Sequence, residues 1–373
     1  MTRQKTQRVR TLPKPRSSVP RSSVPRPSSR REVKRSINQY GVFPVAVSRV
    51  ERLTDSFVRV SLTGRSLLHA AAPISDGTGQ VYDAYIKLLI PPSGASGPTM
   101  IELDTSWRSR WLASPESERG HMRTYTVSNS RLVPSVGLDG TPLLGMLPAS
   151  EADLEPLARE LPAGLQPEID VDFVLHTDVD GHSGPGSTWA ERAQVGQQVS
   201  ILAPLRGSTL WSSYNPGAAS SLLLLGDETA APALLSILRS LPASATGAVF
   251  LEVPGAQDAL DRLPEVRQAA QRVPGVRLHV LARISGQIRG HQLTRALRTA
   301  CSLEPAPAVA PSDDREADGP LWHLAENPTG TYVLIAGEST VVKTLRRICV
   351  NEAGLPKESI SFMGYWKAGQ AEG

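Results

Sequence analysis

The amino-acid sequence predicts a β-barrel followed by an α/β domain, with six antiparallel strands in the barrel and a doubly wound parallel sheet after it. From about residue 41 to residue 207, short segments of alternating polarity end in turn residues, with no long helix-like stretch between them. Beyond this region, apolar runs alternate with helix-like segments. The chain has 373 residues, which is enough for two domains of ordinary size.

Six segments of the first part read as strands of a small antiparallel barrel. Apolar and polar residues alternate along them, as in a sheet that buries one face. Turn residues close each segment, including a proline pair after the third. In chain order the segments are VFPVAVSRVERL, SFVRVSLTG, VYDAYIKLLIPP, MRTYTV, IDVDFVLH and QQVSILAPLRG.

The second part alternates strands with helices. The run SLLLLGDE is typical of a strand buried on both faces, and TAAPALLSILRSL carries its leucines on one helical stripe. The last helix is predicted to end at Gly354, since glycine commonly follows a helix end. The other strands are GAVFLEV, VRLHVLAR, TYVLIAGE and SISFMGYW, and the other helices are AQDALDRLPEVRQAAQRV and STVVKTLRRICVNEAG. This alternation predicts a parallel, doubly wound sheet.

Three segments stand apart from these patterns. Residues 1–35 hold 12 Lys or Arg and one acid, which gives this segment a charge of +11. Because the whole chain has a net charge of +4, the remaining residues carry a net charge of −7. We expect a disordered basic tail, which could meet a weak anionic partner or act as a transit peptide. Segments 131–168 and 302–328, rich in Pro, Ala, Gly and acids, are interpreted as insertions. The predicted domains are therefore residues 36–210, with the first insertion, and 211–373, with the second.

Composition excludes several classes of protein. No run approaches about 18 apolar residues, so no transmembrane segment is predicted. The two cysteines, Cys301 and Cys349, are too few for a disulfide framework or an iron–sulfur domain. The seven histidines show no metal-ligand spacing, and no metal site is predicted. We expect a cytoplasmic monomer.

The stretch RTYT at 123–126 combines residue types that suit a flat, anionic ligand. Arg123 and Tyr125 share one face of a strand, about 7 Å apart. An arginine can pair with phosphate in a bidentate fork, a tyrosine can stack on a ring, and Thr126 can bond the ring edge. A flavin would span both sites. The alternative is an ordinary barrel strand with a surface arginine.

The stretch GPGST at 184–188 is a glycine-rich turn that opens a short helix. Backbone N–H groups at a helix start bind phosphate. The alternative is a loop with a serine at the helix N-cap.

Four stretches of the chain resemble the siderophore-interacting proteins, which are FAD-dependent ferric-siderophore reductases of the ferredoxin–NADP reductase superfamily. The stretches occur in the same order as in that family. The resemblance extends over about residues 36–373. It implies that the barrel binds the flavin and that the α/β domain binds the nucleotide. The stretches are RTYT (123–126), VDFVLH…GPGSTWA (171–190), LLLGDETAAPALLSIL (223–238) and AGESTVVKTLRRICVNEAGLPKESISFMGYWKAG (336–369).

The resemblance implies FAD contacts in the barrel and at the C-terminus. Arg123 would hold the pyrophosphate, Tyr125 would stack on the ring, and Thr126 would reach the ring edge. Trp366, or the neighbouring Tyr365, would cover the flavin; the alternative is that these aromatics only seal the last strand. The remaining FAD residues implied are His176 in the pocket wall and Gly184, Gly186, Ser187 and Thr188 in the pyrophosphate turn.

The resemblance also implies a nucleotide site in the α/β domain. Arg283 could read the 2′-phosphate of NADPH or sit solvated at a strand end. Lys367 could meet an anionic iron chelate. The other NAD(P)H residues implied are Asp227, Glu228, Thr229 and Ala230 after one strand, and Gly337 and Glu338 after another. For Asp227 and Thr229 the alternative is a helix cap.

The activity implied is oxidoreductase activity: NAD(P)H-driven, FAD-dependent reduction of a ferric siderophore, which releases Fe(II) for iron assimilation. The alternatives are a flavin reductase or electron-transfer component with another acceptor, and a non-catalytic ferric-siderophore-binding protein. The choice between NADPH and NADH and the identity of the siderophore stay open.

Overall fold

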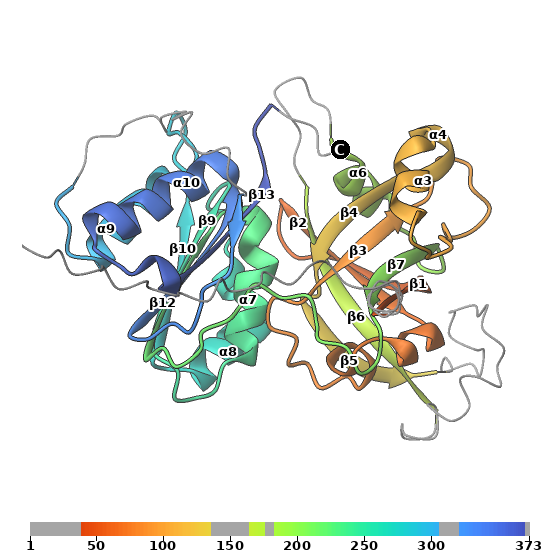
Figure 1. Ribbon diagram of the computed structural model, residues 1–373, viewed down its shortest axis with the longest axis horizontal. Helices are drawn as coiled ribbons and strands as arrows, with labels where there is room; N and C mark the ends of the chain where they lie inside the picture. The colour runs from red at the N-terminus through yellow and green to blue at the C-terminus, as the bar shows by residue number, and fades with distance from the viewer. Residues whose placement is uncertain (1–38, 136–163, 176–182, 306–320, 370–373) are drawn as a thin grey trace, which may run out of the picture.

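The computed structural model describes residues 39–135, 164–175, 183–305 and 321–369, which form two sheet-based halves lying side by side (Figure 1). The antiparallel half comes first in the chain and the half with helices around its sheet comes second. This order was predicted from the change in pattern near residue 210, and it is confirmed. The predicted tail, residues 1–35, lies outside the described residues.

The first half is a curved antiparallel sheet, a half-barrel with its apolar face inside. Its core contains Leu62, Ile86, Ile169 and Ile201, all fully buried. The strands are β1 (Tyr40–Arg52), β2 (Phe57–Thr63), β3 (Tyr85–Ile90), β4 (His121–Thr126), β5 (Asn129–Pro134), β6 (Leu165–Val174) and β7 (Gln198–Pro204). Their order in the sheet is β4-β3-β7-β1-β2-β6-β5.

The sheet has seven strands where six were predicted. The additional strand, β5, pairs with β6 from Asn129↔Asp170 to Pro134↔Leu165. Most of β5 and the first residues of β6 fall inside the segment 131–168 that was interpreted as an insertion, so that boundary was wrong. The local pattern of β5 is short and ends in proline, and it becomes a strand because the edge of β6 supplies backbone partners. The remainder of the segment, 136–163, lies outside the described residues.

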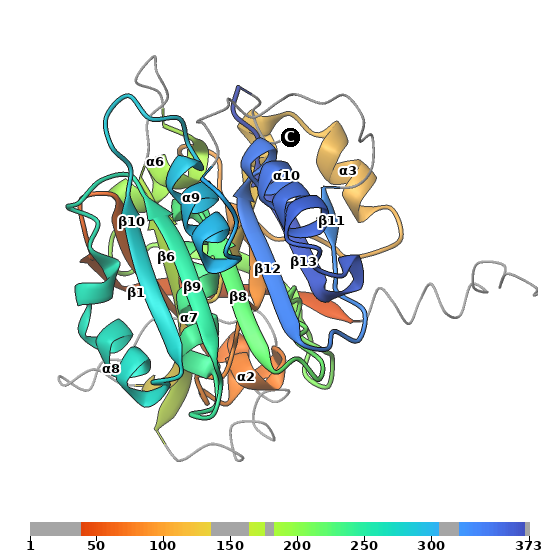
Figure 2. The same ribbon diagram turned by 90° about the vertical axis from the view of Figure 1, so that its left-hand side faces the viewer.

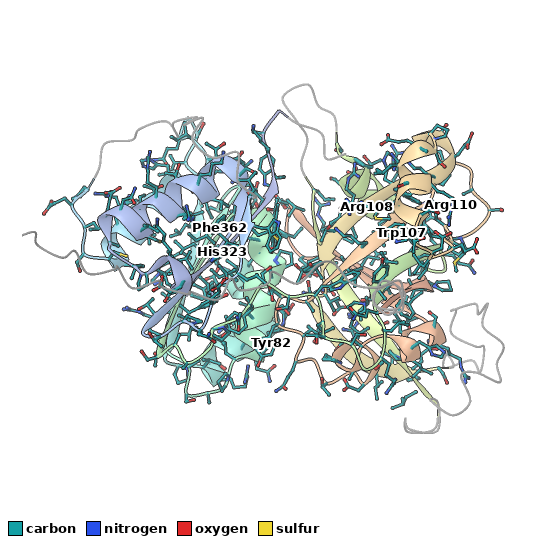
Figure 3. All side chains as sticks on the ribbon, in the orientation of Figure 1. Tyr82, Trp107, Arg108, Arg110, His323 and Phe362 are labelled. Atoms are coloured by element: carbon teal, nitrogen blue, oxygen red, sulfur yellow. The ribbon has the colours of Figure 1, made fainter. Side chains whose placement is uncertain are left out.

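Short helices cover the half-barrel. One of them, α3, carries Trp107, whose indole N–H donates to the Tyr40 hydroxyl over 3.0 Å. Trp107 lies within this half and away from the boundary with the second half (Figure 3). The short helices are η1 (Arg65–His69), α2 (Ala72–Ser75), α3 (Trp107–Ala113), α4 (Glu116–Arg119) and α6 (Pro185–Arg192).

The second half is built on a mixed sheet. Its strands are β8 (Ser221–Gly226), β9 (Gly247–Val253), β10 (Val276–Ala282), β11 (Trp322–His323), β12 (Thr331–Glu338) and β13 (Ile360–Trp366), in the order β10-β9-β8-β12-β13-β11. Five of them run parallel, but β11 joins β13 antiparallel at Trp322↔Met363. An all-parallel sheet was predicted, and β11 falls in the segment 302–328 that was interpreted as an insertion. Its two residues are too few to leave a pattern.

Helices lie on both faces of this sheet (Figure 2). Leu222 and Leu224 of β8 face α7, whereas Leu223 and Leu225 face α9 and α10. This two-sided burial explains the continuous apolar run. The helices are η2 (Glu228–Ala230), α7 (Ala231–Ser240), η3 (Leu260–Arg262), α8 (Pro264–Arg272), α9 (His291–Ala300), α10 (Ser339–Arg347), the π-helical turn η4 (Ile348–Glu352) and η5 (Lys357–Ser359). No helix among the described residues has the length and apolar character needed to cross a membrane.

The two halves share an apolar cluster and a buried carboxylate. Phe57 of β2 packs among Leu235 and Leu260 of the second half. Beside it, the fully buried carboxylate of Asp258 accepts hydrogen bonds from the turn between β1 and β2. The donors are the hydroxyl of Thr54 (2.6 Å) and the amide and hydroxyl of Ser56 (both 2.9 Å).

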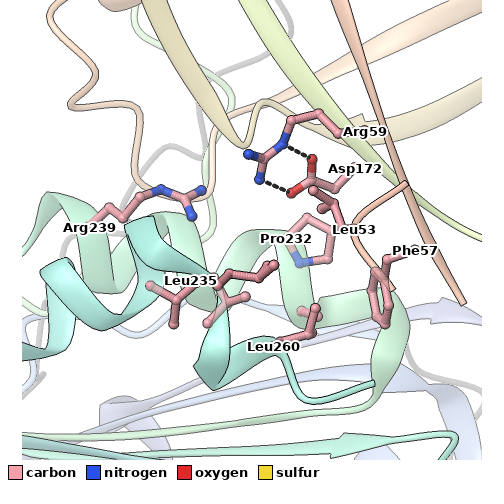
Figure 4. A pocket seen from close by; sticks show the side chains of 11 residues that line it. Leu53, Phe57, Arg59, Asp172, Pro232, Leu235, Arg239 and Leu260 are labelled. Carbon is pink, nitrogen blue, oxygen red and sulfur yellow. Dashed lines mark hydrogen bonds and ion pairs between the residues drawn. The ribbon is translucent and has the colours of Figure 1, made fainter. Parts of the chain in front are cut away.

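An ion-pair network lines the same boundary. The guanidinium of Arg59 in β2 donates to both oxygens of Asp172 in β6 (2.7 and 2.9 Å) and to Glu265 of α8 (2.8 Å). Figure 4 shows Arg59 and Asp172 paired above the apolar side chains of Phe57 and Leu235. Tyr82 also lies at the boundary and stacks on Tyr214, with ring centroids 5.3 Å apart (Figure 3). The contacts at this boundary are both apolar and polar.

We predict that Asp258→Ala lowers the free energy of unfolding by about 1–3 kcal/mol, since three donors lose their buried acceptor. Urea denaturation of the wild type and the variant measures the difference. Asp261→Ala, three residues further on and exposed, is the matched control and should leave the midpoint unchanged. Equal stability of Asp258→Ala and the wild type would show that the turn is not held by this carboxylate.

Candidate functional site

The first part of the candidate site lies on β4. Arg123 pairs with Leu88 of β3, and Tyr125 pairs with Ile86. Because residues two apart on a strand face the same way, Arg123 and Tyr125 share a face, as was predicted. The ring of Tyr125 packs against Phe173 of β6, with centroids 4.4 Å apart and planes tilted by 49°.

The first turn of α6 lies directly against Tyr125. A β-carbon built on Gly186 would lie 1.7 Å from the Tyr125 hydroxyl oxygen, so any larger residue here would have to displace the Tyr125 ring. Gly184, at the N-cap of α6, provides no side-chain cap for the helix. The structure therefore brings together the two motifs that the sequence assigned to one ligand, although they are about 60 residues apart.

Arg123 carries a charge that no carboxylate balances among the described residues, since none lies within 4 Å. Its guanidinium donates to the carbonyl of Met122 over 2.9 Å. A cation without a counter-ion, beside a helix start without a side-chain cap, fits the pyrophosphate of a dinucleotide cofactor. The buried indole N–H of Trp189 in α6 also lacks an acceptor in the described part of the chain. Sequence reasoning missed Trp189, although it lies inside a quoted motif.

The positions of the other residues predicted to bind FAD give less support for contact with a ligand. Thr126 ends β4, opposite Tyr85 of β3, and is half-buried. Ser187 is buried, and the amide of Thr188 donates to the Gly184 carbonyl within the helix. His176 lies outside the described residues.

The second part of the candidate site lies at the carboxyl edge of the parallel strands. Nucleotides bind at such an edge, where the strand order reverses. Charged residues gather there from strands that are distant in sequence. They are Asp227 and Glu228 after β8, Glu252 in β9, Arg283 after β10 and Glu338 at the end of β12, and the neutral indole of Trp366 at the end of β13 lies beside them.

Asp227 connects three of these strand ends. Its buried carboxylate accepts from the amide and hydroxyl of Thr229 (2.9 and 2.6 Å), the amide of Glu338 (2.8 Å) and the indole N–H of Trp366 (3.2 Å). Burial, and next the charge of Glu228, raise the pKa of Asp227 to about 6. The carboxylate is therefore ionised at neutral pH and acts as a cap, which is the alternative that the sequence left open.

Gly337 and Ala230 complete this corner by close packing. Gly337 has φ +136°, and a β-carbon there would lie 2.6 Å from the carboxyl carbon of Asp227. Ala230 is fully buried, and its amide donates to the Asp227 carbonyl over 3.0 Å. Asp227 and Gly337 thus hold the two turns against each other, whereas Thr229 and Ala230 bond to Asp227 within the first turn.

Glu228 pairs with two arginines. Arg283 donates to both of its oxygens (2.6 and 3.1 Å), and Arg289 donates to one of them. Burial would raise the pKa of Glu228, but the bonds from Arg283 and the charges of Arg289 and Arg283 outweigh it and lower the pKa. Arg283 is therefore not solvated at the strand end. Sequence reasoning missed Arg289, which lies in a loop without a recognisable motif.

The C-terminal strand ends over this cluster. The guanidinium of Arg289 lies 4.7 Å from the centre of the Trp366 ring. The hydroxyl of Ser339 donates to the Trp366 carbonyl (2.7 Å), and Glu338 caps α10 through the amides at 340 and 341. Lys367 follows and is exposed. These contacts of Trp366 are with the second half; its predicted role over a flavin is not tested by them.

Two family models match the chain. A siderophore-interacting FAD-binding domain matches residues 46–135 and 158–209. A siderophore-interacting protein model matches residues 219–369. Together they span both halves.

Among curated relatives, the chain is 30% identical over 206 residues to the ferric vibriobactin reductase ViuB of Vibrio cholerae, covering 55% of this chain and 61% of that one. It is 25% identical over 204 residues to the ferric acinetobactin reductase of Acinetobacter baumannii, covering 54% of this chain and 56% of that one. The chain therefore matches about three-fifths of the length of these relatives.

Two solved structures share the fold. One is a siderophore utilization protein from T. fusca, with a TM-score of 0.54 and 23% identity over 89% of this chain and 95% of that one. The other is the siderophore-interacting protein from Acinetobacter baumannii, with a TM-score of 0.51 and 18% identity over 89% and 92%.

We predict that Gly186→Ala weakens FAD binding by roughly tenfold or more, because the methyl group displaces Tyr125 and overpacking costs about 1–3 kcal/mol. Titration of the apoprotein with FAD measures it, and the thermal midpoint of the apoprotein should fall as well. Gly184→Ala is the matched control for stability: its methyl group meets nothing within 4 Å at φ −62°, so the midpoint should not change. A Gly186→Ala apoprotein as stable as the wild type would refute the contact.

Proposed function

The chain belongs to the siderophore-interacting protein family, and from this premise we propose that it is an FAD-dependent oxidoreductase that uses NAD(P)H to reduce ferric siderophore. The observation that carries the proposal is the unbalanced charge of Arg123, on the same face as Tyr125, whose hydroxyl lies over the first turn of α6. This combination suits a cofactor with a flat ring and a pyrophosphate.

Each residue of the barrel site has a role in holding the cofactor. Arg123 would hold the pyrophosphate of FAD, together with the first amides of α6, at Gly186 and Ser187. Tyr125 supports the ring. Bound FAD supplies the redox chemistry, accepting a hydride and passing electrons on singly. The protein supplies position and charge.

The carboxyl edge of the second sheet is the proposed site of NAD(P)H. Asp227 holds the turns after β8 and β12 together, and Glu228 holds Arg283 and Arg289 in place. The contacts of Asp258 and Arg59 across the boundary keep this edge at a constant position relative to β4. Fixed relative placement of two reactants lowers the barrier to their reaction.

The proposed substrate is an iron(III) chelate with hard oxygen donors. Two relatives are named for reducing ferric vibriobactin and ferric acinetobactin, which supports this class. Such donors hold Fe(III) better than Fe(II), so reduction favours release of the metal. Lys367 is exposed beside Trp366, where its charge would attract an anionic chelate.

Several expectations stay predictions. These are the domain boundaries near residues 36 and 210, the monomeric state, the cytoplasmic location and the anionic partner of the basic tail.

The test of the proposal is anaerobic. The purified protein should be yellow, NADH or NADPH should bleach the flavin band, and a ferric tris-catecholate should restore it. Bleaching without reoxidation by the chelate would indicate a flavin reductase with another acceptor. A protein that binds the chelate but takes up no FAD would be a siderophore-binding protein, and the proposal would fail.

We predict that Arg123→Ala weakens FAD binding by about ten- to a hundredfold, since a hydrogen bond to a charged group contributes roughly 1.5–3 kcal/mol. Calorimetric titration of the apoprotein measures the change. Arg108→Ala, which removes an exposed cation of α3, is the control and should bind FAD normally. If Arg123→Ala keeps stoichiometric FAD through extensive dialysis, the role of β4 is wrong.

We predict that Lys367→Glu raises KM for the ferric catecholate roughly fivefold, because one screened charge reversal changes the interaction by about 1 kcal/mol. Stopped flow separates reduction of the flavin from its reoxidation, and only reoxidation should change. Lys357→Glu reverses another exposed charge of the same half and serves as the control. Slower reduction with normal reoxidation would assign Lys367 to the NAD(P)H side.

A further inference from the structure

The two arginines at the carboxyl edge of the second sheet already have an anionic partner. Glu228, whose side chain is 4% exposed, lies between Arg283 (15%) and Arg289 (31%). Arg283 uses both terminal nitrogens of its guanidinium on this carboxylate. A bidentate pair of this kind is among the strongest that an arginine forms.

The charges around this pair sum to a net negative charge without a ligand. Glu252, fully buried in β9, lies 3.6 Å from Arg283 and accepts from the amides of Gly290 and Gln292. Asp227 adds a third carboxylate next to Glu228 in the sequence. Against these three acids stand the two arginines, so the edge has no positive charge in excess.

NADH and NADPH differ at the adenosine ribose, where NADPH carries a phosphate in place of a hydroxyl. In doubly wound folds a carboxylate accepts from that ribose hydroxyl when the ligand is NAD, whereas an arginine accommodates the phosphate of NADP. Both residue types are present at this edge. However, both arginines here already pair with Glu228, and Glu252 and Asp227 make the local charge negative. An added phosphate would therefore meet like charges, which disfavours binding.

We infer that Glu228 makes this protein select NADH over NADPH. The inference rests on the proposed function, because it names the donor of that same site. Glu228 acts by occupying the guanidinium groups that a phosphate would need and by offsetting their charge. Arg283 then serves to keep Glu228 ionised and in place.

The experiment compares both donors on the holoprotein. Anaerobic stopped flow should give a ratio of reduction rate constant to Kd at least about tenfold higher for NADH than for NADPH, the size expected for one charge contact. Glu228→Gln keeps the side-chain size, removes the charge that offsets the two arginines and leaves a single, weaker acceptor for them. It should shift the ratio toward NADPH by about tenfold.

The matched control is Glu352→Gln, which breaks a carboxylate–arginine pair with Arg298 in the same half and should leave the ratio unchanged. Calorimetric titration with NAD⁺ and NADP⁺ gives a binding ratio that does not depend on turnover. The wild-type ratio needs no variant, so the test holds even if Glu228→Gln fails to fold.

A wild type that prefers NADPH, or a folded Glu228→Gln with an unchanged ratio, overturns the inference. Failure of both donors to reduce bound FAD overturns the proposed function instead, and tighter binding of NAD⁺ than of NADP⁺ would then still support the role of Glu228. Equal binding of NAD⁺ and NADP⁺, or no binding of either, overturns the inference about Glu228.

Discussion

The arrangement of the two halves depends on one buried carboxylate, that of Asp258. It accepts three hydrogen bonds from the turn between β1 and β2, so the edge of the half-barrel is anchored in the second half. Phe57 follows this turn directly and enters the apolar cluster beneath α7. A buried acceptor with three donors tolerates little displacement, because each lost bond leaves a polar group unsatisfied. The candidate residues on β4 and the carboxyl edge of the second sheet therefore keep a constant relative position.

The arginines of this protein differ in whether their charge is balanced. Arg59 pairs with Asp172 and Glu265, Arg131 with Glu168 and Asp170, and Arg283 with Glu228. Paired arginines of this kind stabilise or orient the fold, since a buried charge without a partner is costly. Arg123 forms no such pair among the described residues, and it lies on the same face as Tyr125, which contacts the glycine-rich start of α6. That position is the reason why we propose a ligand-binding role for Arg123.

The sequence pattern was sufficient to predict structural features that depend on residues close together in the chain. The four consecutive leucines of β8 predicted a strand buried on both faces, and α7 and α10 do cover it from opposite sides. The alternation in RTYT predicted that Arg123 and Tyr125 share a face, which the pairing with β3 confirms. In contrast, β5 and β11 escaped prediction, because short segments become strands only when a distant strand offers its edge.

The sequence by itself determined the order of the two halves, the shared face of Arg123 and Tyr125 and the family to which the chain belongs. Only the tertiary structure decided how the charged residues are paired. Glu228 and Arg283 are 55 positions apart, and they meet because β8 and β10 end at the same edge of one sheet. Arg289 and Trp366 join them from a loop and from the last strand. The alternation of apolar and polar residues predicts which face of its own strand a side chain lies on. Which charged residues meet depends instead on how distant strands are ordered in the sheet.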